Sequence, residues 1–505
     1  MSSSLRTRAE ATNYRETSLH ADVMTFIAGL QAKADPRLFV SSFGTSVQGR
    51  ELPLLVLSEA GVQTPEQARA LGRPILLMQD GIHPGEVEGK EASLAFVRDL
   101  LDGQYDDLLA HLTLVVVPLF NPDGNDALDP ANRRLDLAKL SGQIGPVVGT
   151  RTQSEGINLN RDYMRQQAPE MRALQSRVVQ VWEPDLTIDT HATNGSLHRM
   201  WMTYDVPHTV ASGRAEPIEF MRERMMPAVQ AALAKNHGLL AGWYGNFVED
   251  ERTLDAHQPA VPDAPVREGW MTYPHNPRFG GNYRGLASRL DLLLECYSYL
   301  GFAERTRTTY ATILEALRYL AAHRDEVLKL IASCATPRDQ IAIRYKLDAF
   351  TQPIEIPTHT PRTLEGAEST VSIPYFGNFV GAKVVDRPRG YAVPVDVADH
   401  LALHGFPNTS AIGEHDVEVA TVTGFDTEGG RKILEASEVG DLEVTWQRTK
   451  RTLPADYRLI STDHRAAAII VYLCEPESDD NVIEHGVIAA PAAGAEYPIW
   501  RVLTA

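Results

Sequence analysis

Two side chains that can bind a metal ion follow an apolar stretch near position 80. His83 and Glu86 stand three positions apart in His83-Pro-Gly-Glu86, shortly after Pro74-Ile-Leu-Leu-Met78. A turn opened by proline and glycine lets a histidine nitrogen and a carboxylate oxygen point at one ion. The same spacing recurs at 323–326 and 415–418, so this pair by itself is a weak signal for a metal site.

A third candidate ligand lies about a hundred residues further along the chain. The segment Asp185-Leu-Thr-Ile-Asp189-Thr-His191 has the composition of a buried strand that ends with an aspartate and a histidine. Catalytic zinc sites take two histidines and one carboxylate and leave a position for water, which becomes a nucleophile near neutral pH. We therefore predict that His83, Glu86 and His191 bind zinc, the alternative for His191 being a hydrogen-bonded core residue.

A carboxylate ends another apolar stretch, Leu290-Asp-Leu-Leu-Leu-Glu295. Burying a carboxylate is costly unless it is paired or its pKa rises. The task that fits Glu295 is that of a general base toward a water molecule on the metal.

An amide and a guanidinium stand together in Gly156-Ile-Asn-Leu-Asn160-Arg161-Asp162, before an expected helix. Arginine gives two parallel hydrogen bonds to a terminal carboxylate, and the adjacent amide donates a third. Asn160 and Arg161 are thus candidates for binding a substrate carboxylate. The alternative is a helix-capping turn, in which Asp162 complements the helix dipole.

Strands and helices that alternate along the first two thirds of the chain must position these residues. Such alternation predicts an α/β sheet covered on both faces, with ligand sites at the carboxyl ends of the strands. Apolar stretches predict strands at 38–43, 52–57, 74–78, 112–117, 186–188 and 290–294, and helical spacing predicts helices at 20–33, 87–101, 170–182, 218–237 and 304–333.

The pattern changes after Pro337, where segments alternate as half-exposed strands do. Examples are 341–345, 417–422 and 442–446, with short helices expected at 395–404 and 464–473. We predict a catalytic domain over residues 1–337 and a second, mainly β domain over 338–505, which contains no predicted catalytic residue. A chain of 505 residues is long enough for two hydrophobic cores.

Charge and cysteine content exclude several classes of protein. A net charge of -18 argues against nucleic acid or an anionic membrane as the main partner. The three cysteines, Cys296, Cys334 and Cys474, are far apart, which indicates neither a disulfide framework nor a cysteine zinc site. The beginning of the sequence lacks an apolar signal-peptide core, so we expect a cytoplasmic protein, or a periplasmic or secreted one if a leader has been removed.

Five short pieces of the sequence occur in an order typical of a known family. They are Phe43-Gly-Thr-Ser-Val-Gln-Gly-Arg50, Asp80-Gly-Ile-His-Pro-Gly-Glu86, Phe120-Asn-Pro-Asp-Gly124, Gly156-Ile-Asn-Leu-Asn-Arg161 and Ile188-Asp-Thr-His191. Together they resemble the M14 (carboxypeptidase A-like) family of zinc carboxypeptidases, in its large bacterial form. The resemblance runs from about residue 14 to 326 and implies a three-layer α/β/α sandwich on a mixed twisted sheet.

The resemblance also implies a role for each candidate residue. One zinc ion is expected on His83, Glu86 and His191, with Glu295 as general base and later proton donor. Asn160 and Arg161 are expected to bind the C-terminal carboxylate of the substrate.

Two further roles in the family are harder to place on this sequence. An arginine that polarises the scissile carbonyl is assigned to Arg151, which precedes the Asn-Arg pair, with Arg133 and Arg134 as rivals. The tyrosine that caps the substrate is assigned to Tyr283, whose alternative is a tyrosine packed beside a glycine turn.

The sequence departs from the family pattern at two positions. Asn158 stands where many members have an aspartate that orients the first zinc histidine, so either metal affinity is weaker or another group orients His83. Asp162 replaces the common second asparagine.

The predicted function is that of a zinc-dependent metallocarboxypeptidase, which hydrolyses the C-terminal peptide bond of a peptide or peptide-like substrate with a free carboxylate. The same residues would also serve a zinc amidohydrolase that acts on acylated amino acids or cell-wall peptides. A third possibility is an inactive zinc- or peptide-binding protein, against which the intact Glu295 argues. The sequence does not indicate the side-chain preference, the oligomeric state or the role of residues 338–505.

Overall fold

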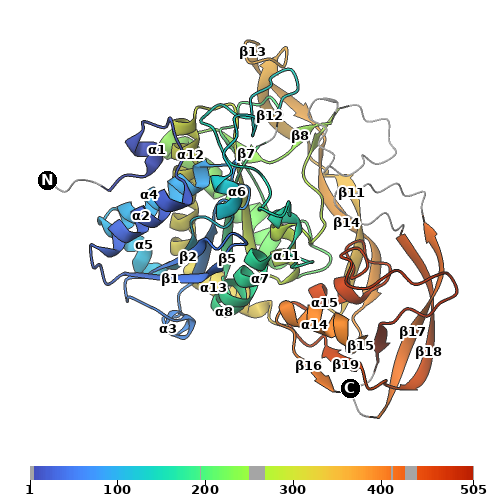
Figure 1. Cartoon of the computed structure of the whole chain (residues 1–505). Coiled ribbons are helices and arrows are strands. Elements are labelled where there is room, and N and C mark those ends of the chain that lie inside the picture. Colours follow the sequence, from blue (N-terminus) through green and yellow to red (C-terminus); the bar gives the residue numbers. More distant parts are fainter. Residues whose placement is uncertain (1–4, 194, 249–267, 411–412, 427–440, 504–505) are drawn as a thin grey trace.

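The computed structural model describes residues 5–193, 195–248, 268–410, 413–426 and 441–503. Within them, a central sheet of eight strands runs in the order β1-β2-β4-β3-β5-β10-β6-β7. Figure 1 shows its strands β1, β2 and β5 among the surrounding helices. Parallel and antiparallel neighbours both occur, so the sheet is mixed, as predicted. In this spatial order the strands are β1 (Leu38–Thr45), β2 (Glu51–Leu57), β4 (Thr113–Val117), β3 (Ile75–Gln79), β5 (Leu186–Ala192), β10 (Leu290–Cys296), β6 (Met202–Asp205) and β7 (Ala241–Trp243).

The three strands that carry or precede the candidate site are neighbours in this sheet. β3, β5 and β10 are mutually parallel, so their carboxyl ends meet at one edge. His191 and Glu295 are register partners on β5 and β10. Sequence segments that are about a hundred residues apart are thereby brought side by side.

Both faces of the sheet are buried, because side chains alternate along each strand. On β3, Leu76 and Met78 join one apolar cluster, and Ile75 and Leu77 join another. The first cluster is covered by α2 (His20–Gln31), α4 (Glu88–Leu101), α5 (Asp106–His111), α9 (Glu216–Phe220), α10 (Met226–His237), α12 (Phe302–Ala322) and α13 (Arg324–Ser333). The second is covered by α7 (Pro169–Leu174), α8 (Gln180–Trp182), α11 (Gly280–Leu286) and parts of the chain after residue 337.

This arrangement is the predicted three-layer α/β/α sandwich. The expected helices at 170–182 and 218–237 each contain a π-helical turn, at Gln175–Val179 and Met221–Met225. The expected helix at 304–333 is divided at His323 into α12 and α13. Short helices also lie at α1 (Arg8–Ala11), α3 (Pro65–Ala70) and α6 (Pro122–Asp126).

The chain after residue 337 is rich in strands, as predicted. Its larger sheet runs in the order β16-β19-β15-β20-β17-β18 and is formed by β15 (Gly390–Pro394), β16 (Asn408–Ser410), β17 (Glu414–Asp426), β18 (Asp441–Thr452), β19 (Tyr457–Ser461) and β20 (Trp500–Val502). A hairpin pairs β12 (Ile354–Thr360) with β13 (Ala367–Ile373). Two helices, α14 (Val395–Leu403) and α15 (Ala467–Cys474), lie where the sequence predicted them.

One smaller sheet includes strands from both sides of the expected boundary at 337/338. It pairs β8 (Asn246–Phe247) and β9 (Trp270–Met271) with β14 (Tyr375–Asp386) and β11 (Gln340–Ala349), in the order β11-β14-β9-β8. The apolar cluster on the second face of the central sheet also contains residues from both parts. The division into two folding units stays a prediction, because a sheet and a core continue across it.

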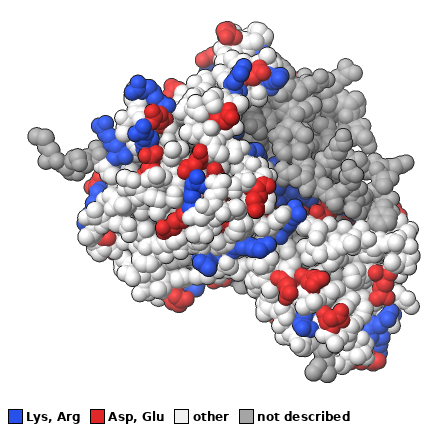
Figure 2. Space-filling view, viewed as in Figure 1, with Lys and Arg blue, Asp and Glu red and all other residues white. Residues whose placement is uncertain are grey.

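Charged side chains of both signs are interspersed over the face of the molecule shown in Figure 2. Within the described residues, no helix combines the length and the apolar composition that a bilayer crossing requires. Cys296, Cys334 and Cys474 are buried and unpaired with one another, as the sequence indicated.

Candidate active site

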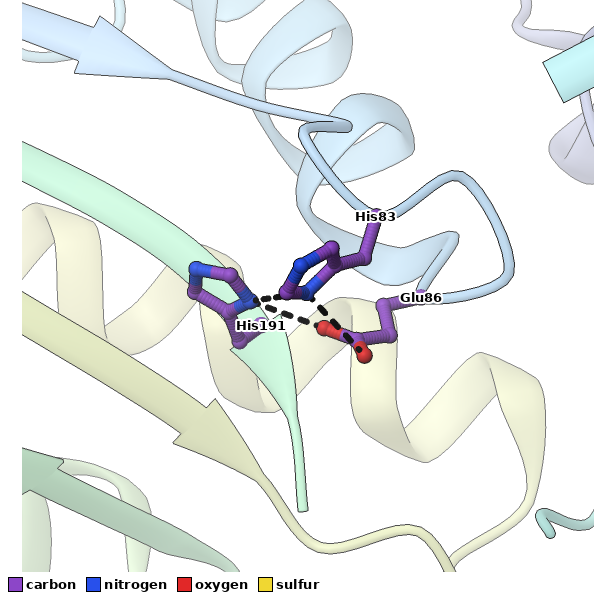
Figure 3. A group of neighbouring side chains, drawn as sticks. All are labelled: His83, Glu86 and His191. Atoms are coloured by element: carbon purple, nitrogen blue, oxygen red, sulfur yellow. Dashed lines mark hydrogen bonds and ion pairs between the residues drawn. The ribbon is translucent and has the colours of Figure 1, made fainter. Parts of the chain in front are cut away.

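The loop after β3 and the end of β5 bring the three predicted metal ligands together (Figure 3). Nδ1 of His83 lies 3.1 Å from Nδ1 of His191 and 3.5 Å from Oε1 of Glu86. Nδ1 of His191 lies 2.9 Å from Oε2 of Glu86. All three side chains are buried, so the surrounding protein holds their donor atoms at these distances.

The hydrogen bonds of His83 fix which of its nitrogens can bind a metal. Oδ1 of Asn158 accepts from the backbone N–H of Asn160 and lies 3.0 Å from Nε2 of His83. Nε2 must therefore carry the proton, which leaves the lone pair of a neutral ring on Nδ1. Burial, with the charge of Arg151, lowers the pKa of His83 to about 3, so the ring is neutral. Asn158 is thus the group that orients His83.

His191 has an ion-pair neighbour in Asp189, whose Oδ1 lies 3.3 Å from Nε2 without the geometry of a hydrogen bond. Burial by itself would lower the pKa of His191, but Asp189 and Glu86 raise it well above its usual range. In the same way, His83, Arg133 and His191 outweigh burial and hold the pKa of the Glu86 carboxyl well below its usual range. The site is therefore arranged to stabilise positive charge between two nitrogens and a carboxylate.

These distances fit a zinc ion. Ligand atoms at about 2.1 Å from zinc in tetrahedral geometry lie about 3.4 Å from each other, and the separations found here are 3.1, 3.5 and 2.9 Å. Two imidazoles and one carboxylate are also the donor set of a catalytic zinc site. Within the described part of the chain, this is the one such group of histidine, cysteine and acidic side chains.

Two arginines surround the Glu86 carboxylate and differ in their other contacts. Nη1 of Arg133 donates to Oε1 of Glu86 at 2.8 Å, and the rest of its guanidinium contacts Gln143 and the carbonyl oxygen of Thr193. Nη1 of Arg151 lies 3.3 Å from the same oxygen, and 37% of its side chain is exposed. Arg151 lines the cavity described next, whereas Arg134 is an exposed surface residue.

A cavity of about 700 Å³, including its open mouth, adjoins the three ligands. Its floor is one face of β5 and β10, which carries Asp189, His191, Asp291, Leu293 and Glu295. Loops, short elements and the end of β5 around the metal ligands His83 and Glu86 form the rest of the lining, which consists of Arg151, Asn160, Arg161, Ala192, Tyr244, Tyr273, Phe279 and Gly281. Burial raises the pKa of the Glu295 carboxyl to about 8, with His191 opposing and Glu86 reinforcing this shift. A carboxyl group with this pKa can exchange a proton near neutral pH.

Asn160 and Arg161 lie in the cavity wall, in a short 3₁₀ turn at Leu159–Arg161. Oδ1 of Asn160 accepts from the backbone N–H of Gly280 at 3.0 Å. The guanidinium of Arg161 stacks on the ring of Phe279, 3.8 Å from its centroid. Asp162 accepts hydrogen bonds from the backbone N–H groups of residues 167 and 168, just before α7 begins. These bonds agree with the alternative interpretation of Asp162 as a residue that caps a helix.

The assignment of Tyr283 to the cavity was wrong. Its hydroxyl lies 2.8 Å from Nδ1 of His404, and its ring packs against Tyr163 in the core, because α11 turns this residue inward. The tyrosines that line the cavity are Tyr244 and Tyr273. The sequence offered no signal for either, since both lie in or beside very short strands.

The wall of the cavity around residues 273–281 is held by the part of the chain after residue 337. Asp480 accepts from the backbone N–H and from Nε of Arg278, at 2.8 and 3.0 Å, and Oδ2 of Asp479 lies 2.7 Å from Nε2 of His275. Arg278 and His485 outweigh burial and lower the pKa of Asp480 below its usual range. These buried ion pairs join the C-terminal segment to residues adjacent to Phe279 and Gly281.

Comparison with known proteins agrees with this geometry. Residues 23–209 match the model of the family described as zinc carboxypeptidase, Peptidase_M14, and this range contains all three residues of the metal cluster. Residues 23–209 are thus similar to the zinc carboxypeptidase family.

Similarity to two fungal carboxypeptidases extends beyond the matched range. Carboxypeptidase 2 of Trichophyton tonsurans is 23% identical over 492 residues, which cover 90% of this chain and 81% of that protein. Carboxypeptidase 2 of Trichophyton equinum is 22% identical over 489 residues, with the same coverage. Among solved structures, the metallo-carboxypeptidase from Burkholderia cenocepacia is similar at 17% identity and a TM-score of 0.42, covering 61% of this chain and 71% of that one.

The remaining family-like pieces support the loops that carry the site. Asp123, from the piece at 120–124, accepts hydrogen bonds from the hydroxyl of Ser46 at 2.6 Å and pairs with Arg50 at 2.7 Å. Its other oxygen accepts from Ser154 at 3.1 Å, three residues from Arg151. These motif residues therefore stabilise the loop that leads from Arg151 to Arg161.

Proposed function

We propose that the protein is a zinc-dependent carboxypeptidase, which removes the C-terminal residue of a peptide with a free carboxylate. The observation that carries this proposal is the placement of the His83, Glu86 and His191 cluster in a cavity that is also lined by Glu295 and Arg161. A base and a carboxylate-binding group beside a metal site are the parts that an exopeptidase requires.

His83 and His191 would hold the zinc ion through Nδ1, and Glu86 through its carboxylate. When bound there, zinc supplies Lewis-acid polarisation of the substrate carbonyl and makes water acidic enough to react at neutral pH. Asn158 and Asp189 keep the two rings in the orientation and tautomer that the ligands need.

Arg161 and Asn160 would bind the C-terminal carboxylate of the substrate. A guanidinium binds a carboxylate through two parallel hydrogen bonds, and stacking on Phe279 holds its plane in a fixed orientation. Recognition of the free carboxylate restricts cleavage to the last peptide bond.

Glu295 would take a proton from the attacking water and pass it to the nitrogen of the leaving amino acid. Its position on β10, as the register partner of His191 on β5, supports this role. Arg151 would stabilise the negative charge that develops on the scissile carbonyl oxygen. Among the three candidate arginines it is favoured because it lines the cavity, whereas Arg133 has several protein contacts and Arg134 is exposed.

The variant Arg161→Ala tests the exopeptidase proposal. We expect KM for peptides with free C-termini to rise by about a hundredfold, as expected for the loss of a charge-assisted pair of hydrogen bonds worth about 3 kcal/mol. Arg134→Ala, which removes an exposed arginine outside the cavity, serves as the matched control and should leave KM unchanged. Equal cleavage by the wild type of free and C-terminally amidated peptides would contradict the proposal.

A further inference from the structure

The inner end of the cavity is lined by Asp291, whose role is not explained by the reaction above. Asp291, Leu293 and Glu295 alternate along β10 and face the same side of the sheet, and all three line the cavity. At about 3.3 Å per residue, Asp291 lies about 13 Å along the strand from Glu295. The cavity therefore extends inward from the metal site, along β10, to a second carboxylate.

Only one oxygen of Asp291 is engaged by the protein. Nε of Arg284 donates to Oδ2, whereas Oδ1 accepts no hydrogen bond from any residue that the structure describes. A Cβ atom at Gly281 would lie 2.9 Å from Oδ1 and 3.1 Å from the hydroxyl of Tyr273. The absence of a side chain at Gly281 thus leaves space where a carboxylate oxygen and a phenol hydroxyl converge.

The charge of Asp291 is only partly matched by the protein. Arg284 is buried and pairs with both Asp291 and Asp189, the latter at 3.3 Å. Asp291 therefore shares its one guanidinium partner with a second carboxylate. Burial raises the pKa of Asp291 to about 6, so the group is still mainly ionised at pH 7. A buried carboxylate in this state is stabilised by a cation.

The route to Asp291 is lined by apolar surface. Leu293 lies between Glu295 and Asp291 along β10, and Phe279 also lines the cavity. A lysine or arginine side chain matches this environment, because its aliphatic stem packs on apolar surface while its charged end reaches a polar partner. A phenylalanine or leucine side chain would instead cover Oδ1 of Asp291 without giving it a hydrogen bond, which is costly.

We propose that the enzyme prefers substrates whose C-terminal residue is lysine or arginine, and that Asp291 is the specificity-determining residue. The preference rests on the proposed carboxypeptidase function, since it requires the last residue of the substrate to occupy this cavity. Gly281 is the second determinant, because it leaves room for the cationic end of the side chain.

A series of peptides that differ only in the last residue tests the preference with the wild-type, zinc-loaded protein. Norleucine is the matched comparison for lysine, because it has a similar stem and no ammonium group. We expect kcat/KM to be at least thirtyfold higher for C-terminal lysine than for norleucine, phenylalanine or glutamate, since a site built for a polar group discriminates strongly against analogues that lack it. Equal or faster cleavage of the norleucine or phenylalanine peptide would overturn the preference and leave the carboxypeptidase function intact. Failure to cleave any of the peptides would overturn the proposed function itself.

Two variants assign the preference to named residues. Asp291→Asn removes the charge and keeps an oxygen that can accept from Arg284, so the ratio of kcat/KM for lysine over norleucine should fall to near one. Gly281→Ala leaves the Arg284–Asp291 pair in place and occupies the space beside Oδ1, and it should lower the same ratio. A folded Asp291→Asn protein that keeps the wild-type ratio would exclude Asp291 as the determinant. If Asp291→Asn does not fold, the ratio of kcat/KM for lysine over norleucine is measured for Gly281→Ala instead. A ratio equal to that of the wild type would then overturn the assignment of the preference to this end of the cavity.

Discussion

The Nδ1 atoms of His83 and His191 lie 3.1 Å apart, and each ring has its other nitrogen close to an oxygen, of Asn158 or Asp189. Both lone pairs therefore point into the same space, beside the Glu86 carboxylate. An arrangement of this kind is stable when a cation occupies that space.

The first prediction concerns metal content. We expect the purified wild-type protein to bind one zinc ion per chain, and His83→Ala and His191→Ala to bind less than a tenth of that, measured by inductively coupled plasma mass spectrometry. His323→Ala is the matched control, because His323 stands three residues before a glutamate as His83 does and lies outside the cluster. Retention of stoichiometric zinc by His83→Ala would show that the ion is bound elsewhere.

The second prediction concerns Asn158, which replaces the aspartate of many family members. A carboxylate at this position would be a stronger acceptor for Nε2–H of His83 and would make its Nδ1 more basic. We expect Asn158→Asp to raise zinc affinity by about tenfold and Asn158→Leu to lower it by about ten- to a hundredfold. Competition with a fluorescent chelator measures both changes. Equal zinc affinities in the wild type and both variants would show that Asn158 does not influence metal binding.

The third prediction concerns Glu295. Replacing it with glutamine preserves its shape and removes the base, so kcat should fall by about a hundred- to ten-thousandfold, while zinc content stays at the wild-type value. A variant that loses zinc along with activity would indicate a ligand or folding role for Glu295 instead.

The dependence of the wild-type activity on pH follows from the same residue. A general base works when it is deprotonated, so kcat/KM should rise with pH as Glu295 ionises. The pKa of this carboxyl is about 8 without a cation, and a nearby divalent ion lowers the pKa of a carboxyl group. We expect the midpoint of the acid limb to lie below 8 in the zinc enzyme. A profile that falls with rising pH in this range would contradict the role of base.

The part of the fold that holds the site could be predicted from the sequence, and the part of the cavity wall formed by residues 273–281 could not. Apolar stretches before His83, His191 and Glu295 were long enough to identify β3, β5 and β10, and the rule for parallel sheets then placed their ends together. Tyr283 was misplaced because a glycine-rich segment gives no amphipathic pattern from which the direction of a side chain can be inferred. Asp291 was overlooked for another reason: strand alternation places it on the same face as Glu295, but the sequence does not show that the cavity extends that far along β10.

Contacts between distant segments also escaped prediction. Arg278 and Asp480 are about 200 residues apart, and charged residues of this kind are common on surfaces, so nothing in the sequence showed that they form a buried pair. The sequence accordingly assigned no role to residues 338–505, whereas the structure shows that they contact the wall of the cavity.

The fourth prediction concerns this buried pair. Asp480→Asn leaves the Arg278 guanidinium buried without its counter-ion, so the free energy of unfolding should fall by about 3 kcal/mol. We also expect KM to rise severalfold with zinc content unchanged, because the pair positions residues beside Phe279 and Gly281. Glu326→Gln, which breaks the exposed pair with Arg224, is the control and should change neither quantity. An unchanged KM in a destabilised Asp480→Asn protein would confine this pair to a structural role.

Mass-spectrometric profiling of a peptide library, digested by the wild-type protein with and without a zinc chelator, reports both the position of cleavage and its dependence on metal. We expect products shortened by one residue at the C-terminus, none from C-terminally amidated peptides, and loss of all cleavage when the chelator is present. Internal or N-terminal cleavage, or cleavage that the chelator does not affect, would contradict the proposed function.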